Sequence, residues 1–131
     1  MDKIAIIDDD PSIVEVFSQA LTFFGYDTCP FTDPSAALAS LPREEPVPGL
    51  ILLDLMMSPM TGLQFLEEQK KSASLRRIPV IIVSAWDLPA GDRERFKVIA
   101  DVIRKPVHPR ELAGRIRTVL DREKGESADQ V

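Results

Sequence analysis

Gly49-Leu50-Ile51-Leu52-Leu53-Asp54 decides the fold of this 131-residue chain, because it is a run of large aliphatic residues that ends in one carboxylate. Pro46 and Pro48 precede the run and Ser58-Pro59 follows it, so the pattern predicts a short strand buried on both faces. Asp54 is then expected at the carboxyl end of the strand, and ligands of open α/β sheets bind at that edge. Taken alone, Asp54 is more simply a residue that starts a turn or caps the next helix.

Four further apolar runs predict strands. They cover residues 4–7, 26–29, 78–83 and 100–103, and Pro30 is expected to limit the second of them. Apolar residues at helical spacing follow each strand, over residues 11–24, 35–41, 61–73, 92–98 and 109–122. Strands that alternate with helices and carry unbroken apolar runs predict an α/β fold, a doubly wound parallel sheet with helices on both faces.

Composition narrows the function. The chain has 21 acidic and 16 basic residues and a net charge of −5, which argues against a nucleic-acid surface. Cys29 is the one cysteine, so an intramolecular disulfide is excluded, and we expect its side chain to be buried. The sequence lacks a signal peptide and a membrane-spanning apolar run, so we expect a cytoplasmic protein without membrane contact. Residues 1–122 are expected to form one domain, and residues 123–131 a frayed polar tail or the remnant of a linker.

Four of the five expected strands end in polar functional groups. Asp8 and Asp9 follow the first strand, Asp54 the third, Ser84 the fourth and Lys105 the fifth. Because the carboxyl ends of parallel strands lie at one edge, these groups are expected to converge. Each residue also has a simpler role as a helix cap or a solvated charge, but their joint position favours a functional site.

Three carboxylates in one pocket need a compensating cation, because two unit charges ~4 Å apart repel by about 4 kcal/mol at an effective dielectric of roughly 20. Oxygen ligands with room for water favour Mg2+, and the absence of His and Cys at these strand ends argues against zinc. A lysine and a hydroxyl beside the metal suit a transferring phosphoryl group. Asp54 is the preferred nucleophile because it stands alone mid-sheet, whereas Asp8 and Asp9 suit metal binding.

The pattern resembles the receiver domain of bacterial two-component response regulators over residues 3–122. The motifs that carry the resemblance are Ile6-Ile7-Asp8-Asp9-Asp10, Leu52-Leu53-Asp54-Leu55-Met56-Met57, Gly62, Val83-Ser84-Ala85 and Lys105-Pro106. The resemblance implies five parallel strands in the CheY-like order 2-1-3-4-5.

The resemblance also implies residue roles around a metal. Asp54 would accept a phosphoryl group from the phosphohistidine of a sensor histidine kinase or a phosphotransfer protein. Asp9, Asp54 and the backbone carbonyl of Met56 would bind Mg2+, and Asp8 would act on the metal largely through water.

Ser84 would bind a phosphoryl oxygen after transfer, and Lys105 would pair with the phosphoryl group. Pro106 would hold the Lys105 loop in shape, through a cis bond. Family members tune hydrolysis of the phosphate at the positions of Met56 and Trp86; neither of these large side chains orients water, so we expect slow self-dephosphorylation.

The sequence departs from the family pattern at three places. Pro59 follows Ser58, where the family has its proline one position earlier. Val102 stands where a switch aromatic is expected, so the signal would travel by the backbone and Ser84. Val98-Ile99 replaces the small residues before the last strand, which is expected to leave the adjoining helix short or shifted.

The sequence is compatible with three functions. The leading hypothesis is a phosphorylation-controlled switch that signals to a downstream protein target or to a removed output domain, without direct nucleic-acid binding. The alternative is a pseudo-receiver, an interaction domain without physiological phosphorylation, which Val102 and Pro59 allow. A Mg2+-dependent phosphatase with an Asp nucleophile lacks a general acid two residues after Asp54, where Met56 stands.

Side chains outside this pattern receive simpler interpretations. His108, the one histidine, precedes Pro109 and a helix, so a surface or capping role is favoured over phosphotransfer. Trp86 is interpreted as an anchor for its loop rather than a partner contact. The arginines of the last helix mix with acidic residues, which is typical of a solvated helix face.

Overall fold

The computed structural model describes residues 2–129 and has five strands, each followed by a helix. In chain order the elements are β1 (Lys3–Ile7), α1 (Pro11–Phe23), β2 (Asp27–Phe31), α2 (Pro34–Ser40), the 3-10 turn η1 (Leu41–Arg43), β3 (Leu50–Leu53), α3 (Gly62–Lys70), β4 (Val80–Ser84), α4 (Asp92–Arg95), β5 (Ile99–Arg104) and α5 (Pro109–Asp129).

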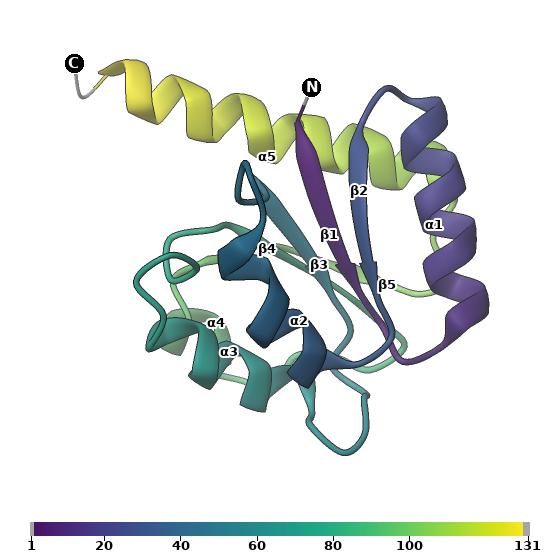
Figure 1. Ribbon diagram of the computed structural model, residues 1–131, viewed down its shortest axis with the longest axis vertical. Coiled ribbons are helices and arrows are strands. Elements are labelled where there is room, and N and C mark those ends of the chain that lie inside the picture. Colours follow the sequence, from purple (N-terminus) through teal and green to yellow (C-terminus); the bar gives the residue numbers. More distant parts are fainter. Residues whose placement is uncertain (1, 130–131) are drawn as a thin grey trace.

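All strand pairs are parallel, and the strand order is β2-β1-β3-β4-β5 (Figure 1). Both the doubly wound class and the order 2-1-3-4-5 are therefore confirmed. β3 lies in the middle of the sheet with all four residues buried, as its unbroken apolar run predicted. None of the helices in the described part of the chain is long and apolar enough to cross a membrane.

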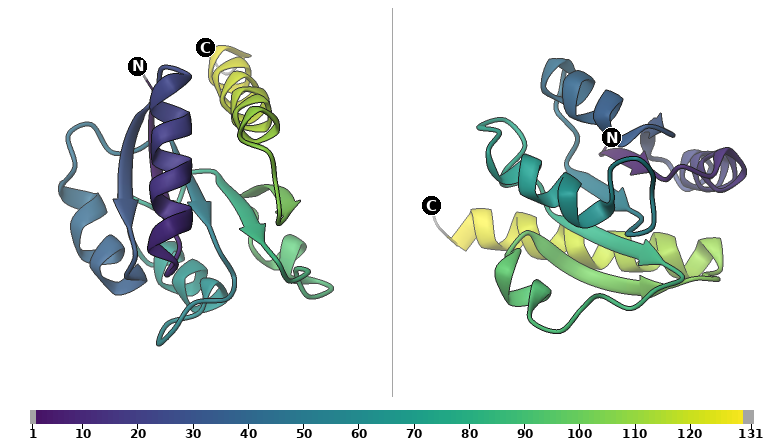
Figure 2. Two further views of the ribbon diagram at one scale, coloured as in Figure 1. Left: turned by 90° about the vertical axis from the view of Figure 1, so that its right-hand side faces the viewer. Right: turned by 90° about the horizontal axis from the view of Figure 1, so that it is seen from below.

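The core consists of two apolar layers, one on each face of the sheet. Ile6 and Leu52 point toward α1 and α5, whereas their neighbours Ile7 and Leu53 point toward α2 and α3. Figure 2 shows α1 and α5 side by side on one face and α2 with α3 on the other. The alternation follows from the two-residue period of a strand, which sends successive side chains to opposite faces.

Side-chain caps fix the starts of three helices. Asp10 accepts a hydrogen bond from the Ser12 amide at 2.9 Å, and Asp33 caps α2 in the same way. Thr61 begins α3 with a capping box, in which its hydroxyl and the Gln64 side chain satisfy each other's backbone amides. Local sequence thus sets where α1, α2 and α3 begin.

β2 corrects the prediction that Pro30 limits the second strand. The strand runs from Asp27 to Phe31, and Pro30 lies opposite Ile6 of β1. β2 is the outermost strand, so a residue without an amide proton is tolerated on its open side. Cys29 in the same strand is buried, as predicted, and burial is the main cause that raises the pKa of its thiol to about 11.

The last two helices differ from their predicted bounds, although the short α4 (Asp92–Arg95) confirms the expectation from Val98-Ile99. α4 is a single turn that ends before Phe96, because this residue turns extended (φ −113°, ψ 90°) and buries its ring in the core. α5 continues past Arg122 to Asp129, so the last helix is longer than predicted. That the polar residues 123–131 are a tail or the remnant of a linker stays a prediction. Residues 130 and 131 lie outside the described residues.

Candidate functional site

Two neighbouring strands position the central carboxylates. Asp8 directly follows β1 and Asp54 directly follows β3, and these strands pair up to Ile7 and Leu53. The Asp54 amide donates to the Ile7 carbonyl at 3.1 Å, which extends the sheet pairing by one residue. Both side chains are buried, with relative exposures of 4% for Asp8 and 6% for Asp54. The predicted convergence of these two residues is therefore observed.

Lys105 connects the two carboxylates from the far edge of the sheet. Its ammonium lies 2.6 Å from Asp8 Oδ2 and 3.1 Å from Asp54 Oδ2. Its amide donates to the Ser84 carbonyl at 2.9 Å, so β4 fixes the start of the Lys105 loop. The Lys105-Pro106 bond is cis, as expected. Lys105 therefore already compensates two of the three carboxylates that were expected to rely on a metal.

Burial and charge pairing shift the pKa values of Asp8 and Lys105. Burial raises the pKa of Asp8 above 3.8, and the hydrogen bond from Lys105 only partly offsets this. Burial alone would lower the pKa of Lys105, but the hydrogen bond to Asp8 and the charges of Asp8 and Asp54 outweigh it, and the pKa is raised. The lysine is thus held protonated beside its two carboxylates.

Asp8, Asp9 and Asp54 together can hold a metal ion. One carboxylate oxygen from each lies within 4.8 Å of the others. Oδ1 of Asp8 accepts the Asp10 amide at 3.0 Å, and Oδ1 of Asp54 accepts the Met56 amide at 3.1 Å, so these bonds orient the carboxylates. Asp9 is exposed at the same place. A hard divalent cation suits this donor set, because all its ligand atoms are oxygens and one side is open to water.

Ser84 is the last residue of β4, and Trp86 follows it in the loop at the same edge of the sheet. The Ser84 side chain is fully buried, and its hydroxyl accepts a hydrogen bond from the Trp86 amide at 3.3 Å. Trp86 is 62% exposed, which argues against its interpretation as a loop anchor. Met56 is 50% exposed on the β3 side. Two large apolar side chains are therefore exposed in the loops that follow β3 and β4.

Gly62 permits the turn that carries Asp54. A methyl group at Gly62 would lie 2.8 Å from the Leu55 Cα and would overlap the Asp54 carbonyl oxygen. The Gly62 amide also donates to the Leu55 carbonyl at 3.0 Å. Only a residue without a side chain fits here, which explains why this glycine belongs to the motif.

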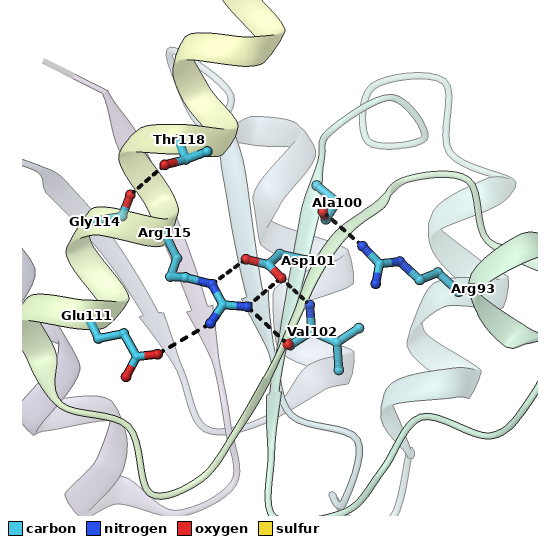
Figure 3. Close-up of polar contacts among 8 residues, drawn as sticks. All are labelled: Arg93, Ala100, Asp101, Val102, Glu111, Gly114, Arg115 and Thr118. Carbon is cyan, nitrogen blue, oxygen red and sulfur yellow. Dashed lines mark hydrogen bonds and ion pairs between the residues drawn. The ribbon is translucent and has the colours of Figure 1, made fainter.

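An ion pair that the sequence did not predict links β5 to α5. Arg115 binds Asp101 through two hydrogen bonds of 2.7 Å and donates a third to the Val102 carbonyl at 3.3 Å, while Glu111 approaches the same guanidinium (Figure 3). Arg115 is therefore not part of a purely solvated face. The hydrogen bonds from Arg115 are the main cause that lowers the pKa of Asp101.

His108 serves as the cap of α5, as predicted. Its Nδ1 accepts the Arg110 amide at 3.1 Å, and its carbonyl accepts the Leu112 amide at 3.0 Å. The ring lies at the start of the helix rather than mid-helix.

The protein is thus a doubly wound α/β protein with an acid cluster and a lysine at the carboxyl edge of its parallel sheet. Residues 4–117 match the response regulator receiver domain, and the chain belongs to this family. Its receiver-domain character agrees with the two-component resemblance inferred from the motifs.

Named relatives are longer than this chain. It is 35% identical over 122 residues to "Probable transcriptional regulator ycf27" of Porphyridium aerugineum, covering 92% of this chain and 49% of that protein. It is 33% identical over 124 residues to "Phosphate regulon transcriptional regulatory protein PhoB" of Klebsiella pneumoniae, covering 92% and 52%. The chain therefore spans about half the length of the curated relatives it matches.

Solved receiver domains share the fold. The CheY-like receiver domain protein of Methanospirillum hungatei JF-1 superposes with a TM-score of 0.82 at 28% identity, covering 96% of this chain and 98% of that one. The N-terminal receiver domain from Methanoculleus marisnigri JR1 gives 0.72 at 34% identity, covering 90% and 95%.

Proposed function

We propose that this chain is a phosphorylation-controlled switch in which Asp54 accepts a phosphoryl group from a histidine kinase or phosphotransfer protein in a Mg2+-dependent reaction. The observation that carries the proposal is the Lys105 ammonium, which bonds both Asp54 and Asp8 across the sheet edge. A cation held 3.1 Å from the acceptor carboxylate lies where a transferred phosphoryl group would need charge compensation. A cytoplasmic location is part of the same proposal.

The transfer step requires one new bond and one broken bond. An Asp54 carboxylate oxygen bonds to phosphorus while the phosphorus–nitrogen bond of the donor phosphohistidine breaks and its imidazole leaves. Asp9, Asp54 and the Met56 carbonyl would hold Mg2+, and Asp8 would orient its water. The bound ion would supply charge neutralisation between carboxylate and phosphoryl oxygens.

Phosphorylation would then rearrange the charge pairs around Lys105. The phosphoryl group carries about −1.5 to −2 charge at pH 7 and replaces the single charge of the Asp54 carboxylate, which is lost as the acyl phosphate forms, so more negative charge would face Lys105. Lys105 and the Ser84 hydroxyl would both turn to the phosphoryl oxygens. Because the Lys105 amide already bonds the Ser84 carbonyl, a shift of either residue would carry the other and bias β5 and α5.

The output of the switch is proposed to be a protein contact or a further domain of the same protein. Relatives of about twice this length are named as transcriptional regulators, which supports gene control as the eventual output. Those names concern the longer proteins. The absence of direct nucleic-acid binding by residues 1–131 stays a prediction.

Phosphorylation of the purified chain tests the proposal. Acetyl phosphate and Mg2+ should add one phosphoryl group by intact-mass spectrometry, and Asp54→Asn should remove it. The sole tryptophan, Trp86, directly follows the Ser84 loop, so its fluorescence should respond to Mg2+ and then to beryllofluoride.

Each alternative gives a different result in these assays. A pseudo-receiver would show neither the added mass nor the two fluorescence responses, and that result would refute the proposal. A phosphatase would instead turn over a phosphomonoester repeatedly. If the Asp54→Asn variant still gained the mass of one phosphoryl group, the acceptor would be another residue.

A further inference from the structure

A basic hollow lies at the end of the sheet opposite the Asp54 site. It has a volume of about 500 Å³ and forms where β4 and β5 begin. Its walls come from the loop before β4, from α4 and the turn after it, and from the late part of α5. Five cationic side chains line it: Arg76, Arg77, Arg93, Lys97 and Arg122.

The charge of this basic hollow is largely uncompensated. Glu123 is the one carboxylate among the described residues that line it, against five cations, in a chain whose net charge is −5. Within the described part of the chain, Arg76, Arg77, Lys97 and Arg122 form no ion pair.

Elsewhere in the described part of the chain, most cations form ion pairs. Arg95 binds Glu67, Arg104 binds Asp87 at 2.9 Å, and Arg115 binds Asp101 at 2.7 Å. In the basic hollow, by contrast, unpaired cations lie close together, and their like charges repel one another. An anionic ligand would relieve that repulsion.

A hydrogen bond holds the Arg93 guanidinium at the wall of the basic hollow. Its guanidinium reaches from α4 to β5 and donates to the Ala100 carbonyl at 3.3 Å (Figure 3). Ala100 is itself a lining residue, so this guanidinium is held at the wall with further N–H groups to offer. Buried Pro79 and Ile99 give the lining an apolar part.

We propose that the basic hollow binds a phosphorylated small molecule of nucleotide size. Four of its five cations are arginines, whose planar forks match phosphate oxygens in pairs. The apolar part of the wall would contact the organic body, and guanidinium planes stack on base rings. A concave site of this volume suits a small ligand rather than the extended backbone of a duplex.

An NMR titration of the 15N-labelled chain with ADP and with pyrophosphate tests the assignment. The titration is run with EDTA, to leave the acidic site without metal, and at ~0.15 M ionic strength, to screen weak surface attraction. We expect saturable shifts of the Arg77, Ile99 and Ala100 amides. Asp54→Asn should bind equally, so the result is independent of the proposed phosphorylation. Stronger binding of ADP than of pyrophosphate identifies a nucleotide, and equal binding identifies the phosphate groups alone; both support the proposal.

Paired charge removals separate a defined site from general attraction. Arg76→Gln with Arg77→Gln should weaken ADP binding by at least about tenfold, because the loss of even one charged hydrogen bond contributes that much. The control, Arg43→Gln with Arg110→Gln, removes two exposed cations on other surfaces and should leave the affinity unchanged.

Three results would overturn the proposal. The first is a titration in which the chemical-shift changes do not saturate, or an affinity for ADP that is weakened equally in both double variants. The second is a set of shifts confined to the Asp8 and Asp54 edge. The third is binding of a poly-glutamate peptide or duplex DNA without binding of ADP or pyrophosphate, which would make the basic hollow a contact for an acidic macromolecule.

Discussion

Lys105→Met should destabilise the protein at neutral pH in the absence of a divalent metal. The ammonium lies 2.6 Å from Asp8 and 3.1 Å from Asp54, and the side chains of the three residues are 15%, 5% and 8% exposed. Methionine keeps most of the side-chain volume and removes only the charge. The variant therefore leaves two buried carboxylates without their shared cation.

The expected loss is about 3 kcal/mol in the free energy of unfolding, near the lower end of what removing one partner from a buried ion pair costs. The lower end applies because 15% of the lysine side chain reaches solvent and water can approach the carboxylates. This loss should depend on pH. Burial already raises the pKa of Asp8 above 3.8, and without Lys105 the backbone hydrogen bond from Asp10 is the remaining interaction that opposes this rise.

The sign of the pH dependence follows from linkage. A carboxyl whose pKa is higher in the folded state binds more protons there, so stability is lost as the pH rises through the folded-state pKa and is regained as the pH falls toward 3.8. The gap between Lys105→Met and the wild type should thus be widest at neutral pH and shrink on acidification.

Urea unfolding followed by circular dichroism, in EDTA and over a range of pH, measures this effect. Adding Mg2+ should recover more stability in Lys105→Met than in the wild type, because the ion no longer competes with the ammonium. Lys71→Met is a control, since Lys71 is 69% exposed and its pair with Glu68 contributes under about 1 kcal/mol. Equal stability of Lys105→Met and the wild type at neutral pH in EDTA would refute the reasoning.

Three further predictions concern other residues. Gly62→Ala should cost at least about 2 kcal/mol, measured by urea unfolding, because its methyl group would overlap backbone. Arg115→Ala should cost about 1 kcal/mol above pH 4 and less in acid, because the pKa of Asp101 is lowered from 3.8 and the pair is lost as that carboxylate protonates. Met56→Asn with Trp86→Glu should shorten a long aspartyl-phosphate lifetime, measured by loss of the added mass.

Controls accompany these predictions. Gly114→Ala lies in α5 with nothing within 4 Å of the added methyl, so it should be neutral or stabilising. A Gly62→Ala variant as stable as Gly114→Ala would contradict the close approach at Gly62. For Arg115→Ala, an undiminished loss at acid pH would exclude Asp101 as its partner. A wild-type phosphate half-life of seconds would contradict slow self-dephosphorylation.

The site could be predicted from the sequence because its geometry depends on a few strong signals. Unbroken apolar runs ending at Asp8, Asp54 and Ser84 require a parallel sheet, and a parallel sheet brings strand ends to one edge. Lys105 reaches the same edge by the same rule. The roles of these residues in metal binding and phosphorylation stay predictions.

What the sequence did not predict depends on contacts between distant elements. Pro30 belongs in a strand only because β2 is outermost, and α4 stops because Phe96 is needed in the core. The Arg115–Asp101 pair requires the register of α5 over β5, which no local pattern encodes. Likewise, Arg76 and Arg122 are separate charges in the sequence, and only the fold brings them to one hollow.

The two apolar layers give a way to trace a signal through this small protein. Ile6 and Ile7 are consecutive, yet their methyl groups lie on opposite sides of the sheet; Ile81 and Ile82 form a second such pair. Selectively labelled isoleucine methyls would therefore report separately on the two faces of the sheet. A resonance that moves in Ile81 but not in Ile82 would assign the response to the α1 and α5 side.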